Sequence, residues 1–257
     1  MLEIFTYTLE MQRRVLRGWA FGLAIYLFGS AGIFFLMEYQ PAVLQYMERL
    51  TGVPDLGIQP AVWFALSVFT AILPAALGIF AVELGSRLIA GEENLGWFNL
   101  LLGVPLPRWQ LLFVKFCFLL ASILALCLLT FVLLGFTGLV ASWRLMFLLP
   151  ACLVLAIQTL LAGSLAFSTG AVTGSLRAAR LVGLTGLLAL LALMLLPVWN
   201  PQANPENNLF LLACSALKNP LIFGSLPICT WVQMGLCAVL FGVAWIGFQR
   251  RDLSEGK

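Results

Sequence analysis

The chain alternates long apolar runs with short segments that carry most of its charges. Each run holds 18 to 24 residues. A helix rises about 1.5 Å per residue, so about 20 apolar residues cross the roughly 30 Å hydrocarbon core of a bilayer. The pattern predicts an all-α membrane protein, with residues 1–257 forming a single transmembrane domain. Its six predicted transmembrane helices cover residues 18–37, 61–82, 111–134, 145–167, 181–198 and 230–248.

The residues before the first run have an amphipathic pattern. Residues 1–17 place apolar side chains on one helical face and charged side chains on another, which is typical of a helix lying in the membrane interface. We therefore expect a separate interfacial helix at the N-terminus. Its apolar face would hold Leu2, Phe5, Leu9 and Leu16, and its charged face would hold Glu3, Glu10, Arg14 and Arg17.

Composition supports a membrane protein and argues against an enzyme. Hydrophobic residues make up 62% of the chain and charged residues 10%, and the mean hydropathy is +1.03. The chain contains no histidine, which removes the commonest metal ligand and the commonest general base near neutral pH. None of its six cysteines has CxxC spacing. We expect no catalytic site and no metal or other cofactor bound by this chain.

One charged stretch, residues 83–115, separates the second and third apolar runs. It carries six of the 25 charged residues of the chain. Within it, four apolar residues follow a helical spacing of i, i+3, i+6 and i+7, while Glu92 and Glu93 point elsewhere. Pro105 and Pro107 would end this helix, because proline lacks the amide donor. The spacing predicts a short amphipathic helix that docks against another structure at the membrane surface, with an apolar face of Leu95, Phe98, Leu101 and Leu102. The alternative is that these apolar residues lie on lipid.

Glu83 and Arg87 lie four residues apart, with the acid first, at the end of the second predicted helix. An exposed pair with this spacing contributes only about 0.3 to 0.5 kcal/mol. We therefore expect the pair to end the helix and present the charged stretch, rather than to stabilise the fold.

The basic residues are distributed unevenly between the two sides of the predicted membrane. Of the 14 Lys and Arg residues, eleven fall at the termini or in the loops on the same side, and three fall on the other side. Cytoplasmic loops carry an excess of Lys and Arg. The count predicts that both termini and the charged stretch face the cytoplasm. We also expect a plasma (inner) membrane location, with the lipid bilayer as a partner and no nucleic acid.

The outer segment between the fifth and sixth runs, residues 199–227, begins polar and then contains two apolar pieces too short to span a membrane. They suit short re-entrant or interfacial helices, and a loop packed on the outer surface is the alternative. Cys214 and Cys229 could pair here, although spacing alone cannot establish the geometry of a disulfide.

A few residues inside the runs have two interpretations each. Gln158 could line a substrate path or hydrogen-bond to a neighbouring helix, and Pro74 could bend its helix beside such a path. Gly18 and Gly22 have the spacing that lets helices approach closely, within the chain or across a dimer.

The stretch from residue 83 to 115 resembles the cytoplasmic loop of ABC-2-type (type V) ABC transporter permeases. The shared features are a charged segment, a glycine, a leucine-rich turn, a Pro-x-x-Arg and a lysine that opens the third helix. The basic exit from the last helix, GFQRRDL, is similar too. In this sequence the loop features are Glu92 and Glu93, Gly96, Leu100 to Leu102, Pro105 to Arg108, and Lys115.

The resemblance implies a permease that works as a homodimer or heterodimer. Each copy would contact a separate ATP-binding subunit through a coupling helix, so that two copies of that subunit are expected, and substrate would move outward. ATP and Mg²⁺ would bind to the partner, since the only Gly-Lys pair here ends the chain and cannot form a P-loop. Glu92, Glu93 and Arg108 would orient the docked coupling helix through charge pairs at its rim.

The sequence therefore favours the membrane subunit of an ATP-driven exporter of hydrophobic or amphipathic substrates. A membrane protein that transports nothing, such as a scaffold for complex assembly, is the alternative, because nothing in the apolar runs proves a path.

Overall fold

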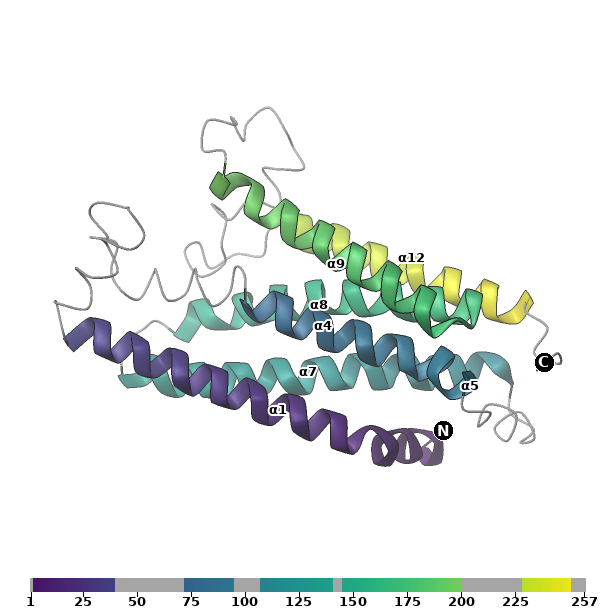
Figure 1. The fold of residues 1–257 in the computed structure, drawn as a ribbon, viewed down its shortest axis with the longest axis horizontal. Coiled ribbons are helices and arrows are strands. Elements are labelled where there is room, and N and C mark those ends of the chain that lie inside the picture. The colour runs from purple at the N-terminus through teal and green to yellow at the C-terminus, as the bar shows by residue number, and fades with distance from the viewer. Residues whose placement is uncertain (1, 40–71, 95–106, 141–144, 200–227, 251–257) are drawn as a thin grey trace.

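The computed structural model describes residues 2–39, 72–94, 107–140, 145–199 and 228–250, and these are helical with no strand among them. The long helices lie side by side in a bundle, and the start of α1, the end of α5, the start of α7 and the end of α12 lie at the same end of it (Figure 1). The helices are α1 (Leu2–Tyr39), α4 (Leu73–Ser86), a π-helix (Arg87–Gly91), α5 (Glu92–Asn94), α7 (Arg108–Val140), α8 (Leu145–Thr173), α9 (Leu176–Trp199) and α12 (Ile228–Arg250).

Five of these helices have the length and apolar composition needed to cross a membrane: α1, α4 with its extension to Asn94, α7, α8 and α12. The fifth predicted run, 181–198, lies within α9, which has 24 residues. The second predicted run, 61–82, is described only from residue 72 onward. The prediction of an all-α membrane protein is confirmed in the described residues, and the six-span arrangement remains a prediction.

The N-terminal region forms no separate interfacial helix. Helix α1 continues without a break for 38 residues. Its first turns bury Ile4, Thr8 and Gln12, whereas Leu9, expected on the apolar face, is 42% exposed. The ring of Phe5 packs edge-on against Phe118 of α7 at 5.4 Å between centroids. The N-terminal residues therefore extend the first helix and pack against α7.

Helix α4 lies close to α8 and α9. A Cβ built at Gly85 would lie 2.5 Å from the carbonyl oxygen of Gly163 in α8, and one at Gly183 in α9 would lie 2.8 Å from the side chains of Ala166 and Val82. Small residues let helix backbones approach this closely in membranes, where dispersion contacts drive helix association. The glycines of α4, α8 and α9 therefore set the spacing in the centre of the bundle.

The connection between α8 and α9 is a tight turn at Gly174, which has a φ of 64°. Glycine adopts this left-handed conformation without the Cβ clash that other residues meet. The Gly174 N–H donates to the carbonyl of Gly170 at 2.9 Å, and the Ser175 hydroxyl accepts from the Ala178 N–H at 3.4 Å, capping the start of α9. These two helices consequently form an antiparallel hairpin.

Several predictions concern residues outside the described part of the chain. They include the short helix with Leu95, Gly96, Phe98, Leu101, Leu102 and Pro105, the outer segment after Trp199, and the pairing of Cys214.

Candidate functional site

The second helix does not end at Glu83 and Arg87, contrary to the expectation from sequence. Helix α4 runs on to Ser86, the π-helix continues it to Gly91, and α5 extends it to Asn94. Single π-turns of this kind occur inside α-helices, frequently at functional sites. The helix thus reaches the start of residues 95–106, which we call the coupling segment.

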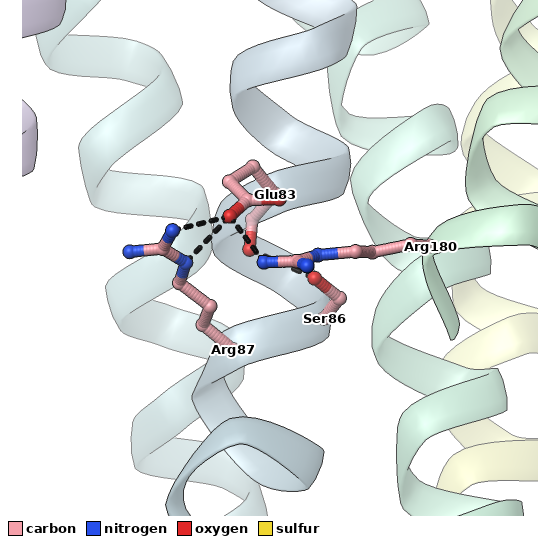
Figure 2. A network of polar contacts seen from close by, with 4 residues as sticks. All are labelled: Glu83, Ser86, Arg87 and Arg180. Atoms are coloured by element: carbon pink, nitrogen blue, oxygen red, sulfur yellow. Dashed lines mark hydrogen bonds and ion pairs between the residues drawn. The ribbon is translucent and has the colours of Figure 1, made fainter. Parts of the chain in front are cut away.

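Glu83 sits between two arginines from different helices (Figure 2). Its Oε1 accepts from Arg87 Nε at 2.6 Å and from Arg180 Nη2 of α9 at 2.6 Å. Arg87 approaches it from its own helix, and Arg180 reaches across from the other side. The side chains are 25% exposed for Glu83 and about 40% for each arginine, so solvent weakens these pairs. The contact with Arg180 ties α4 to α9.

A second ion pair is buried where the coupling segment joins the bundle. Lys115 Nζ of α7 donates to Glu92 Oε2 of α5 and to the carbonyl oxygen of Leu88, at 2.6 Å from the latter. The lysine and glutamate side chains are 1% and 3% exposed. Leu88 belongs to the π-helix, so the lysine binds two successive pieces of the extended second helix.

The energetics of this pair differ from those of a surface pair. Both charges are removed from water, which is costly unless each keeps its partner. Removing one partner of a buried pair typically costs about 3 to 5 kcal/mol, because the other charge is left uncompensated. The Glu92–Lys115 pair therefore joins α5, shortly before the coupling segment, to α7 about two turns after the segment ends.

Residues 3–253 match the family described as ABC-2 family transporter protein. The chain belongs to this family. A search of curated proteins finds no match. As an ABC-2 permease the chain is a membrane transport component and is not itself catalytic, and its family implies association with an ABC ATP-binding subunit.

The burial of Glu92 changes one expectation for the permease. A rim charge that orients a docked subunit has to face that subunit, but Glu92 is 2% exposed and bonds to Lys115 within the chain. Glu93 is half-buried. Arg108 begins α7, and its side chain lies outside the described residues.

The other candidate residues of the permease lie apart from this site. Gln158 is half-buried on α8, and the described residues provide no hydrogen bond to its side chain. Pro74 is buried in the first turn of α4 as the structure describes it. Gly18 and Gly22 are exposed on α1, with nothing within 4 Å of a Cβ built at either position.

Sequence reasoning missed the partner of Lys115, although the sequence held a signal for it. Lys115 is the only charged residue in the predicted run 111–134. A cation inside an apolar helix needs a counter-charge. Glu92 and Glu93 are the nearest acidic residues in the sequence, so one of them was the natural candidate. No comparable signal pointed from Glu83 to Arg180.

No group of three or more His, Cys, Asp or Glu side chains lies together within the described ranges.

Proposed function

We propose that this permease is the membrane subunit of an ATP-driven exporter. In this proposal it moves a hydrophobic or amphipathic substrate out of the cytoplasm or the inner leaflet. Two copies of the ATP-binding subunit bind ATP and Mg²⁺ and drive two permeases, identical or homologous. The chain lies in the plasma (inner) membrane with both termini in the cytoplasm.

The observation that carries the proposal is the buried pair between Glu92 and Lys115. A subunit that changes shape on ATP hydrolysis must push on an element that is fixed to the membrane helices. The coupling segment begins three residues after Glu92 and ends shortly before Lys115, so both of its ends are anchored near the same ion pair. A displacement of the segment would therefore move α4 and α7 together.

The docking surface is proposed on the coupling segment itself. Leu95, Phe98, Leu101 and Leu102 would insert into a groove on the ATP-binding subunit, as amphipathic helices do in many complexes. Glu93 and Arg108 remain as candidates for orienting charges, while Glu92 has an internal role.

The apolar character of the bundle supports the proposed substrate class. The charged residues buried in the described part of the chain are Glu92 and Lys115, and each neutralises the other. A small hydrophilic ion crossing such a bundle would find little to replace its hydration shell. Hydrophobic or amphipathic molecules do not need polar groups to replace a full hydration shell.

The test uses the full chain, purified and reconstituted in vesicles with the ATP-binding subunit encoded beside it. We expect the two chains to associate and ATP hydrolysis to depend on both. Leu101→Asp with Leu102→Asp should abolish association, because two carboxylates would have to enter an apolar groove. Leu9→Asp, at an exposed leucine of α1, is the control and should associate normally.

Two results would contradict the proposal. Undiminished association of the double aspartate variant would remove the docking surface from the coupling segment. Failure of the wild-type chain to bind any ATP-binding subunit would remove the exporter and leave a membrane scaffold in its place.

A further inference from the structure

A hollow of about 530 Å³ lies between α1 and α4, away from the Glu83 and Glu92 ion pairs. This volume falls in the range of about 300 to 1,000 Å³ that small-molecule sites occupy. Trp19 forms one wall, and its ring packs edge-on against Phe80 at 5.7 Å between centroids. The lining includes Arg14, Gly18, Gly22 and Tyr26 of α1 and Leu77 of α4.

Gly18 and Gly22 line this space without side chains that would narrow it. No atom lies within 4 Å of a Cβ built at either position. The glycines in the centre of the bundle differ, since a Cβ at Gly85 or Gly183 would collide with a neighbouring helix. Packing within the described chain therefore gives no reason for glycine at positions 18 and 22.

One end of the hollow is positively charged. Arg14 lines it and is exposed, and Arg13 and Arg17 lie beside it on the same helix. The ion pairs among the described residues use Arg87, Lys115 and Arg180 as their cations. No ion pair joins a carboxylate of the described residues to the three arginines of α1, although Glu10 lies four residues before Arg14, and the rest of the lining is almost entirely apolar.

The shape of the hollow matches a molecule with an anionic head and a long apolar tail. Arg14 and Tyr26 are twelve residues apart on one helix, which is about 18 Å. That length is close to the depth of one leaflet, about half of the roughly 30 Å hydrocarbon core. An arginine guanidinium forms strong charge-assisted hydrogen bonds to phosphate.

We propose that this hollow binds an anionic phospholipid, with its phosphate on Arg14 and one acyl chain along Gly18, Gly22 and Tyr26. A second copy of the chain is a poorer occupant. In a two-fold dimer the same surface meets itself, which would bring the unpaired arginines of both copies together. A lipid headgroup neutralises them instead. This proposal goes beyond the export function and does not depend on it.

The experiment is native mass spectrometry of the full chain released from detergent, with added phosphatidylglycerol or phosphatidylcholine of identical acyl chains. We expect wild type to retain phosphatidylglycerol about tenfold better, because phosphatidylcholine carries the same phosphate together with a quaternary ammonium, which the three arginines repel. Arg14→Gln should reduce this preference to about twofold or less. Gly22→Leu should abolish retention of both lipids, because the leucine side chain occupies the hollow.

Matched controls lie outside the hollow. Gly32→Leu fills open space elsewhere on α1, and Arg250→Gln removes an exposed arginine at the end of α12, so both should retain lipid like wild type. Gel filtration and circular dichroism check that each variant folds. If Gly22→Leu does not fold, the lipid preference of Arg14→Gln, at an exposed position, tests the proposal instead.

The proposal is overturned if Gly22→Leu binds phosphatidylglycerol at the wild-type level, or if Arg14→Gln keeps the full preference. It is also overturned if Gly22→Leu leaves lipid retention unchanged but converts a dimer to a monomer, since a second copy would then fill the hollow.

Discussion

The Lys115 side chain of α7 binds the end of the extended second helix, although residues 95–107 separate the two helices in the sequence. Its ammonium has three donors and no acceptor, and two of these donors are used by Glu92 and by the carbonyl of Leu88. The carbonyl belongs to a π-turn, where the regular i to i−4 hydrogen-bond pattern is interrupted. The lysine therefore compensates both a buried charge and an irregularity in the helix.

Substituting Lys115 alone should destabilise the protein strongly. Lys115→Met leaves the Glu92 carboxylate buried without a counter-charge, and we expect a loss of about 3 to 5 kcal/mol in the free energy of unfolding. Adding Glu92→Gln should recover most of this loss, because no buried charge remains. Denaturant unfolding of the full chain in detergent measures both variants.

Arg177→Gln, at an exposed position in the first turn of α9, is the control and should change the stability little. Equal stability of Lys115→Met and wild type would mean that the pair is not held together in the folded protein.

At the scale of helices, the close approach of α4 and α8 depends on Gly85. In Gly85→Ala the new Cβ would meet a backbone oxygen of Gly163 at 2.5 Å, and a backbone atom cannot rotate away. The helices would have to separate, at a cost of about 1 to 3 kcal/mol, as for other overpacked cores. Thermal unfolding of the purified chain would reveal the cost.

The matched control for Gly85→Ala is Gly32→Ala, which adds the same methyl group to a helix where nothing lies within 4 Å. We expect no loss of stability in that variant. If both alanine variants unfold at the same temperature, the contact between α4 and α8 is looser than the structure indicates.

The sequence located the long helices because the signal for each one is local. A transmembrane helix can be recognised from its own run of about 20 apolar residues, without information about the rest of the chain. The ends of the helices were less predictable. The amphipathic pattern of residues 1–17 indicates a separate interfacial helix, but a helix that continues past the membrane and keeps its charges in water can have the same pattern.

Contacts between distant helices could not be predicted in the same way. Glu83 binds Arg180, which is 97 residues further along the chain, and nothing in either local sequence specifies this partner. The Glu83–Arg87 spacing was visible because the two residues are four apart. The coupling segment lies outside the described residues, so its predicted helix is still a prediction.

At the scale of the whole molecule, the helices are longer than a bilayer requires. The 38 residues of α1 span about 57 Å, against a hydrocarbon core of roughly 30 Å. The ends of α1, α5, α7 and α12 at one end of the bundle, together with the α8–α9 turn, form a face that carries many of the arginines (Figure 1). Positive charge is typical of the cytoplasmic side.

The side of the membrane can be tested with a cysteine in the α8–α9 turn. Ser175→Cys, in a chain whose six native cysteines are replaced by alanine, should react with a membrane-impermeant maleimide only after cells are permeabilised. Its side chain is exposed, and the positive charges of Arg177 and Arg180 nearby are the reason to expect this turn on the cytoplasmic side.

Asp55→Cys lies between the first and second predicted runs, which the predicted topology places on the outer side; it is the matched control and should react in intact cells. Labelling of Ser175→Cys in intact cells would reverse the predicted orientation of the whole chain.

The short turn at Gly174 also has a consequence for the order in which the molecule assembles. Helices α8 and α9 are neighbours in sequence, so their pairing closes almost no loop and can occur as soon as both have been synthesised. Helix α4 is made much earlier, yet its closest contacts are with Gly163 and Leu187 of that hairpin. Until the ribosome has added those residues, the glycine face of α4 has no partner from this hairpin and stays exposed to lipid or to other proteins.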